Sequence, residues 1–233
     1  MLLSRSLAAV AHNATTSTTA PASASVLRNC RPRSFCAFRS SCPSLMSNHS
    51  LFDRGIKPSP AALEAMLAKK IRPYFYYIDI HGQLFLQDTH PKDLTSCFKD
   101  PRFLDFFVPR IRPNTTPFLP EYPWQSPCGK EFNFVEAEDT PIVFHSLIQG
   151  QLRWAGTRET EFKPDQLCIS ASTGRIYHPL PSPFERPDNS TVPPHAYTHG
   201  LIKSSLALSE MANDLSHDSF HWRGETFPLQ QLP

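Results

Sequence analysis

Proline is the residue that most limits how this chain can fold. The sequence contains 24 prolines and only 8 glycines among its 233 residues. Each proline fixes its own φ angle and lacks the backbone N–H that helices and sheets use. The chain is therefore predicted to form short helices and strands joined by many stiff turns. Its length suits one domain, or one domain with two lobes.

The first 52 residues contain five arginines but no lysine and no acidic residue. Their Ser, Thr, Ala and Arg content, with Leu3 and Leu7 on one helical face, is typical of an organellar transit peptide. We therefore predict a disordered, removable transit peptide over residues 1–48 and a location in the mitochondrial matrix. The alternatives are a plastid address, a tail without an address, and a cytosolic form that starts at Met46.

The remainder of the chain is mildly acidic. Removing the five leader arginines from the 23 basic residues leaves 18, against 21 acidic ones, so the body carries a net charge near −3. A general nucleic-acid binder needs clustered Lys and Arg to displace counterions, so we expect no nucleic-acid partner. No apolar run approaches the ~18–20 residues of a membrane-spanning helix. We therefore predict a soluble protein with no membrane span.

The cysteines of the body indicate a reducing compartment. Cys97, Cys128 and Cys168 are widely spaced and odd in number. This pattern fits neither a disulfide framework nor a zinc ribbon. We expect no metal, and no cofactor is evident.

Helices are predicted from capping signals and from apolar spacing. Ser59-Pro60 and Asp100-Pro101 each place a capping side chain before a proline at the first helical turn. A further helical stretch is predicted from Pro91. An amphipathic helix is predicted over Leu201–Leu215.

Strands are predicted from aromatic and β-branched runs and from turn residues. His81-Gly82 joins the first two into a hairpin, and Gly224 joins the last two. The predicted strands are 74–78, 84–86, 122–124, 131–136, 142–148, 152–154, 161–162, 167–169, 175–177, 221–222 and 226–227.

The fold class is predicted as α+β. Asp79–Leu86 and Ser172–His178 each give a turn, a glycine and a short strand, followed later by a helix and a Trp-bearing strand. This echo predicts two similar hairpin–helix–strand lobes packed as one compact body. The predicted segments are a helix and linker at 49–73 and an α+β domain at 74–230, with lobes at about 74–165 and 166–230 and a proline-rich loop at 179–194.

Six strings in the body are specific in combination. They are YFYYIDIHGQLFL, CFKDPRFLDFF, SPCGKEFNF, EDTPIVFHSL, GRIYHP and GLIKSSLAL. Together they resemble an uncharacterised eukaryotic family, UPF 0598. The resemblance implies a mitochondrial protein without an assigned reaction, so no catalytic residue is carried over. The order of elements also resembles a bacterial two-lobed α+β family of unknown function, which suggests fold and not function.

Cys128 is the candidate for catalysis. It lies in a Pro-Cys-Gly turn beside Lys130, and a nearby cation lowers the pKa of a thiol. A nucleophile would also need a base, such as His145 or His178. The alternative, which we favour, is a small half-buried cysteine in a tight turn.

Charged residues near the predicted join of the lobes are the candidates for ligand binding. Arg110, Arg112 and Lys130 are suited to bind an anion. Glu131 and Asp139 are suited to general acid or base chemistry, or to a hard cation. The alternatives are ordinary surface charge and, for Asp139, hydrogen bonds to backbone N–H groups in a turn.

Two histidine pairs have the spacing of zinc ligands on a helix. His195/His199 and His217/His221 are each four residues apart. Both pairs fall in predicted loops or beyond a helix end, so we predict structural roles for them.

The sequence therefore favours a matrix protein that binds a small molecule or a protein partner in the cleft between its lobes. It contains no phosphate-binding Gly loop, no serine elbow and no metalloprotease helix. Whether it is an enzyme stays open, with a non-catalytic role favoured. The alternatives are a Cys128-dependent enzyme and an assembly factor for a mitochondrial complex.

Overall fold

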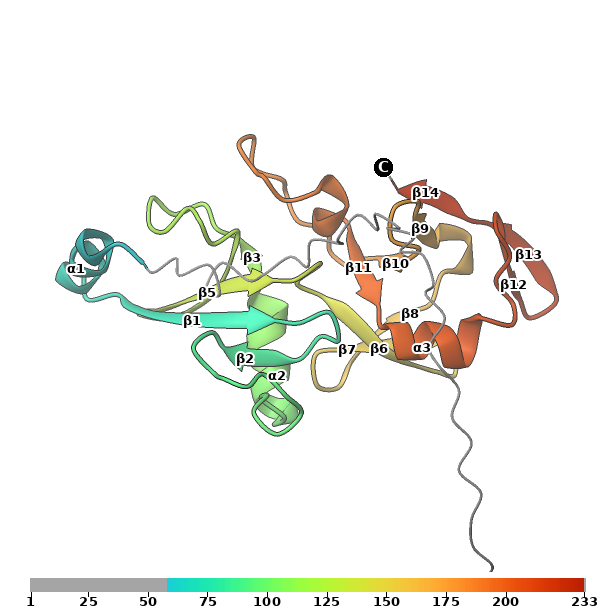
Figure 1. The fold of residues 1–233 in the computed structure, drawn as a ribbon, viewed down its shortest axis with the longest axis horizontal. Helices are drawn as coiled ribbons and strands as arrows, with labels where there is room; N and C mark the ends of the chain where they lie inside the picture. Colours follow the sequence, from blue (N-terminus) through green and yellow to red (C-terminus); the bar gives the residue numbers. More distant parts are fainter. Residues whose placement is uncertain (1–57, 233) are drawn as a thin grey trace, which may run out of the picture. The chain divides into compact units, whose positions relative to one another are not determined.

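The computed structural model describes residues 58–232, and the predicted transit peptide lies outside them. The described residues form two mixed β-sheets with short helices, which confirms the predicted α+β class (Figure 1). In this part of the chain the longest helix has nine residues. Short elements are what the many prolines predict.

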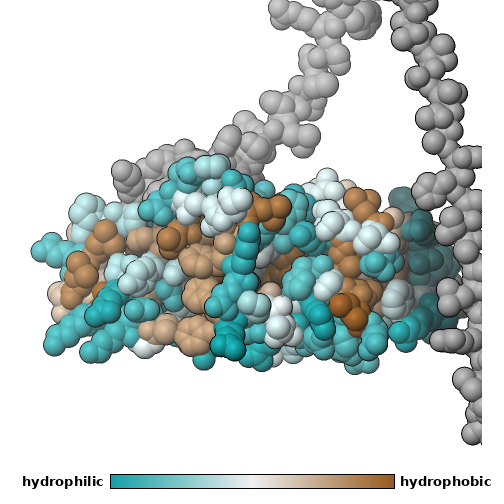
Figure 2. All heavy atoms as spheres, turned by 90° about the horizontal axis from the view of Figure 1, so that it is seen from below, coloured by the Kyte–Doolittle hydropathy of each residue, from teal (hydrophilic) through white to brown (hydrophobic). Residues whose placement is uncertain are grey.

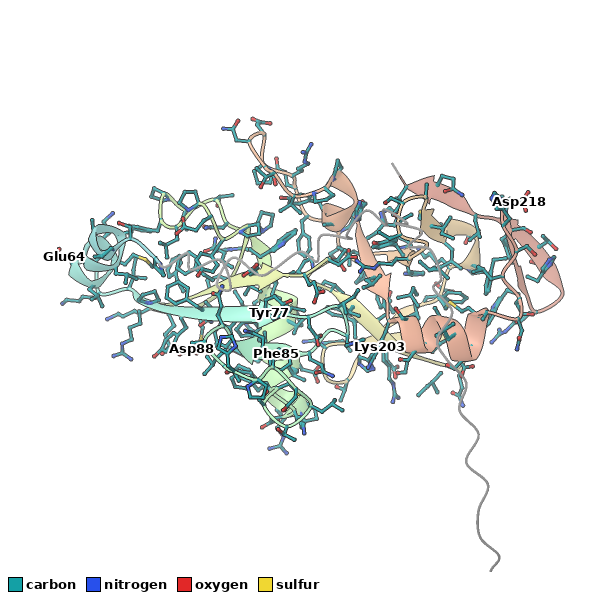
Figure 3. The ribbon with its side chains drawn as sticks, in the orientation of Figure 1. Glu64, Tyr77, Phe85, Asp88, Lys203 and Asp218 are labelled. Atoms are coloured by element: carbon teal, nitrogen blue, oxygen red, sulfur yellow. The ribbon has the colours of Figure 1, made fainter. Side chains whose placement is uncertain are left out.

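The first sheet has five strands within the described residues, in the order β2-β1-β5-β4-β3. β1 and β5 run parallel, whereas the other neighbours are antiparallel. Tyr77 and Phe85 lie opposite each other in the β1–β2 hairpin, which the sequence predicts (Figure 3). The strands are β1 (Arg72–Ile78), β2 (Leu84–Leu86), β3 (Arg112–Pro113), β4 (Trp124–Cys128) and β5 (Glu131–Ala137).

The helices beside the first sheet begin where their capping signals predict. Ser59 precedes the first, which buries Met66. The Asp100 carboxylate accepts hydrogen bonds from the N–H groups of Arg102 and Phe103 at the start of the second, as an N-cap residue does. These helices are α1 (Pro60–Ala68), α2 (Pro101–Phe107) and the 3₁₀ helix η1 (Val108–Arg110) that continues α2.

Aromatic side chains bury α2 against the first sheet. The ring of Phe107 lies 4.7 Å from that of Tyr76, and 5.5 Å from that of Phe103. Trp124 of β4 belongs to the same apolar cluster, which continues to Ile202 beyond the first sheet. The helix α2 therefore contributes Phe107 to the core, with Phe103 packed against it.

The second sheet has seven strands within residues 58–232, in the order β14-β9-β10-β11-β6-β7-β8. β11 runs parallel to β6, and β14 runs parallel to β9. The predicted hairpin across Gly224 forms a separate two-stranded sheet. The strands are β6 (Val143–Ile148), β7 (Gln151–Trp154), β8 (Arg158–Glu161), β9 (Cys168–Ser170), β10 (Ile176–Pro179), β11 (His199–Ile202), β12 (Ser219–Trp222), β13 (Glu225–Pro228) and β14 (Gln230–Leu232).

The helix predicted over Leu201–Leu215 is wrong in its first part, because β11 occupies that part. A Cβ atom on Gly200 would lie 2.8 Å from the ring of Phe144 and 2.9 Å from the carbonyl oxygen of Ile142. The close approach of β11 to β6 thus overrides the local helical pattern. The helical turns of this half are η2 (Pro164–Gln166), η3 (Pro194–Tyr197), α3 (Ser204–Leu206) and a π-helical turn (Ala207–Met211).

The helical stretch predicted from Pro91 is also wrong. Residues 91–99 form turns and bends. The Asp93 carboxylate accepts hydrogen bonds from the N–H groups of Thr95 and Ser96 at 2.7 and 3.1 Å. Such local side-chain bonds compete with a helix for the backbone donors.

The boundary between the two sheets falls earlier than the predicted boundary between lobes. The first sheet ends at Ala137 and the second begins at Val143, whereas the sequence placed the boundary near residue 165. The two predicted hairpins exist as β1–β2 and β9–β10. The order of the strands differs between the two sheets, and β10 pairs with β11 on its other side. The two halves are therefore alike only in their hairpins and in having a helix later in the chain.

A polar contact joins α2 to the turn between β7 and β8. The Asp105 carboxylate accepts hydrogen bonds from the N–H groups of Gly156 and Thr157 at 3.1 and 2.8 Å, and from the Thr157 hydroxyl at 2.5 Å. Partial burial opposes ionisation of Asp105, but these hydrogen bonds outweigh it and lower its pKa. The first sheet's helix is thereby fixed to the second sheet.

Among the described residues, no helix has the length and apolar content to cross a bilayer. On the face drawn in Figure 2, hydrophobic residues alternate with hydrophilic ones in small groups. Scattered apolar side chains of this kind are ordinary on protein surfaces.

Candidate ligand-binding groove

A groove of about 680 Å³ lies between β3 and the proline-rich loop. Arg112, Pro113 and Thr115 form one wall, and residues 183–188 form the other. The loop between β10 and β11, orange in Figure 1, rises beside β3. Arg112 is a predicted ligand-binding residue, and the structure brings it together with a loop far along the chain.

The loop wall is fixed by an aromatic contact and by hydrogen bonds. The ring of Phe184 lies 5.3 Å from that of Trp124, and its N–H donates to the Tyr197 carbonyl oxygen at 2.7 Å. The hydroxyls of Ser190 and Tyr197 are 2.5 Å apart. The Arg186 guanidinium donates to the Ser190 carbonyl oxygen at 3.3 Å. The groove is therefore preformed, which lowers the entropy cost of binding.

Of the described residues, four charged side chains line the groove: Arg112, Glu185, Arg186 and Asp188. All four are exposed. Within residues 58–232, the guanidinium of Arg112 has neither a hydrogen bond nor a salt bridge. It can therefore bind a carboxylate or phosphate through two parallel N–H donors.

Arg110 does not line the groove. Its guanidinium lies 3.9 Å from the centre of the Phe106 ring and donates to the Phe106 carbonyl oxygen at 2.5 Å. A cation near the last carbonyls of a helix stabilises that helix end. Arg110 thus stabilises the C-terminal end of α2.

Cys128, Lys130 and Glu131 lie at the tip of the β4–β5 hairpin, outside the groove. Glu131 is 3.9 Å from Arg72, with both side chains substantially exposed. Among the described residues, no histidine forms a hydrogen bond with the Cys128 thiol. Within residues 58–232, the Cys128 thiol is therefore not hydrogen-bonded to an imidazole that could act as its base.

Asp139, also a predicted ligand-binding residue, lies outside the groove and is bonded to two side chains of the second half of the chain. Its carboxylate lies 2.5 Å from the Arg175 guanidinium and accepts a hydrogen bond from the Tyr177 hydroxyl at 3.0 Å. Burial, together with the adjacent Asp139 charge, raises the pKa of Tyr177 to about 12. The phenol therefore stays protonated and donates. This contact joins the segment that follows β5 to the second sheet.

A thiol and an imidazole that sequence reasoning did not pair lie together in the second sheet. Cys168 Sγ is 3.4 Å from His199 Nε2, and the Thr198 hydroxyl is 2.8 Å from His199 Nδ1. Burial raises the pKa of Cys168 and lowers that of His199. Both groups are therefore neutral, and a buried neutral thiol is unreactive. The pair comes from β9 and β11, which β10 separates, so no sequence spacing reveals it.

The histidine pairs do not share a helix. His195 lies in η3, and His199 lies in β11. Within residues 58–232, no group of three or more His, Cys, Asp or Glu side chains is placed to hold a metal ion.

Comparison with known families adds a relationship but no activity. Residues 65–232 match the model of a domain of unknown function, DUF4505. The chain belongs to this family. The DUF4505 match spans both sheets and includes both walls of the groove.

The DUF4505 domain is also similar to a solved structure of a DUF1285 family protein from Silicibacter pomeroyi. The two are 17% identical, with 76% of this chain and 91% of that chain covered, and the TM-score is 0.39. A likeness at this level carries no conclusion about ligand or reaction.

Proposed function

We propose that this DUF4505 protein acts in the mitochondrial matrix as a non-catalytic binding protein whose ligand or partner segment occupies the groove between β3 and the loop. The observation that carries the proposal is the Arg112 guanidinium on one wall of a preformed groove, where it has no partner among residues 58–232. Concave sites are where proteins commonly bind small molecules, and the polar groups in such a site fix the orientation of the ligand.

Two features of the sequence support the location. The leader is cationic and free of carboxylates, so the inside-negative membrane potential favours its import. The strings that resemble family UPF 0598 agree with a mitochondrial role. The family to which the chain belongs has no assigned activity.

The groove is tested by thermal unfolding of the purified protein against a panel of matrix metabolites and a fractionated matrix extract. A bound ligand at a hundred times its Kd adds about 2.7 kcal/mol of stability, which is a rise of roughly 5–10 °C in Tm for a domain of this size. In Arg112→Ala the rise is expected to disappear.

Lys130→Ala is the matched control, because Lys130 is also an exposed cation but lies in the turn between β4 and β5, outside the groove. It is expected to keep the full rise in Tm. A ligand that stabilises Arg112→Ala as much as the wild type would place binding elsewhere. If no fraction raises the Tm of the wild type, the proposal fails.

A further inference from the structure

The charges of the groove indicate the chemistry of its ligand. Two arginines and two acidic residues line it, so its own net charge is zero. A ligand with only negative charge would approach Arg112 but also meet Glu185 and Asp188. A ligand with only positive charge would meet the two guanidinium groups. Charge complementarity therefore favours a ligand that carries both signs.

The two walls of the groove differ in charge. Arg112 projects from β3 and has no partner within residues 58–232. Glu185 and Asp188 belong to the loop, and in the same described region neither forms a salt bridge or a side-chain hydrogen bond. Arg186, by contrast, is already bonded to the Ser190 carbonyl oxygen. That bond uses one of its donors and leaves its charge in place, so the loop wall carries one net negative charge, opposite in sign to Arg112.

Among the other lining residues are three prolines and a phenylalanine, so few backbone donors face the groove. Pro113, Pro183 and Pro187 contribute no N–H group. Phe184 adds an aromatic ring that is already packed on Trp124. The charged side chains are therefore the main groups of the groove that can recognise a polar ligand.

We infer that the ligand is a short peptide with free ends, whose carboxylate binds Arg112 and whose ammonium group lies against Glu185 and Asp188. The inference rests on the groove being the binding site proposed above. The volume of about 680 Å³ lies within the range of ~300–1,000 Å³ for pockets that bind ligands of moderate size. A tripeptide or tetrapeptide is a ligand of that class.

The test compares four forms of one tetrapeptide library built from Ala, Leu and Phe. The forms have free ends, an acetylated amino end, an amidated carboxyl end, or both ends blocked. Binding to the full chain is measured by calorimetry. The form with free ends is expected to bind roughly tenfold tighter than either singly blocked form, since each block removes one charge-assisted contact.

The variants assign each end to a wall. Arg112→Ala is expected to make binding insensitive to amidation of the carboxyl end. Glu185→Gln combined with Asp188→Asn is expected to make it insensitive to acetylation of the amino end. All these side chains are exposed, so the unliganded variants are expected to unfold at the wild-type temperature, which confirms that they are folded.

The outcomes separate this inference from the proposed function. If the acetylated form binds as tightly as the form with free ends, or if no form binds, the peptide inference is overturned. The groove would still be the binding site if a metabolite from the panel depended on Arg112. If Arg112→Ala affects no ligand at all, both proposals fail.

Discussion

At the scale of single residues, His178 shows how burial fixes a protonation state. The side chain is 1% exposed. Its Nε2 accepts a hydrogen bond from the Lys163 N–H at 2.9 Å, and its Nδ1 lies 2.8 Å from the Pro179 carbonyl oxygen. The rings of Phe144 and Phe162 pack against it. Burial lowers the pKa of His178 to about 4. The imidazole is therefore neutral in the folded protein at pH 7.

This histidine predicts a loss of stability in mild acid. Between pH 6.5 and 4 the unfolded chain binds a proton that the folded chain excludes, so stability falls as the pH falls through that window. The full effect is about 3 kcal/mol. His178→Gln keeps an acceptor but does not titrate, so urea unfolding at pH 7 and pH 4.5 is expected to show a smaller acid loss than in the wild type. His217→Gln, at an exposed site, is the control. Equal acid losses in all three proteins would contradict the assignment.

At the scale of elements, the contact between α2 and the β7–β8 turn depends on a glycine. A Cβ atom at Gly156 would lie 2.8 Å from Pro101 Cα and closer still to the Pro101 carbonyl oxygen. Backbone atoms cannot move aside as a flexible side chain can. The first turn of α2 therefore requires glycine at this position, and the Asp105 hydrogen bonds depend on the same close approach.

Gly156→Ala is accordingly expected to destabilise the protein by about 1–3 kcal/mol, because α2 must shift away from the turn. Urea unfolding measures the change. Thr157→Ser retains the hydroxyl that donates to Asp105 and is expected to change stability by less than about 0.5 kcal/mol. A fully stable Gly156→Ala protein would show that α2 does not pack on this turn.

At the scale of the whole molecule, the chain combines a cationic leader with a body of opposite charge. The leader, residues 1–52, has five arginines and no carboxylate, whereas the body has a net charge near −3. The groove proposed for binding belongs to the body, where β3 and the proline-rich loop meet. Location and binding are therefore expected to depend on separate parts of the chain.

The full chain carrying a C-terminal fluorescent protein is expected to enter mitochondria. Replacing Arg5, Arg28, Arg31, Arg33 and Arg39 with glutamine is expected to leave it in the cytosol, because the membrane potential acts on the cationic leader. Arg112→Ala is the control and is expected to be imported normally. Diffuse cytosolic fluorescence of the wild type would refute the matrix location.

The sequence predicted those parts of the fold that depend on neighbouring residues. Asp100 before Pro101 identified the start of α2, and the glycine turns at Gly82 and Gly224 identified hairpins. It failed at Leu201–Ile202, where parallel pairing with β6 decides the structure. For the candidate site it identified Arg112 but grouped it with Lys130, which lies at a hairpin tip outside the groove.

The sequence by itself determined the α+β class, the starts of α1 and α2, the hairpins and the acidic character of the body, because helix starts, turn geometry and charge depend on residues close together in the chain. Only the tertiary structure decided that Arg112 faces residues 183–188 and that Cys168 lies beside His199. These contacts join residues far apart in the chain. Their positions follow from the order of the strands in the sheets. No pattern of neighbouring residues predicts that order.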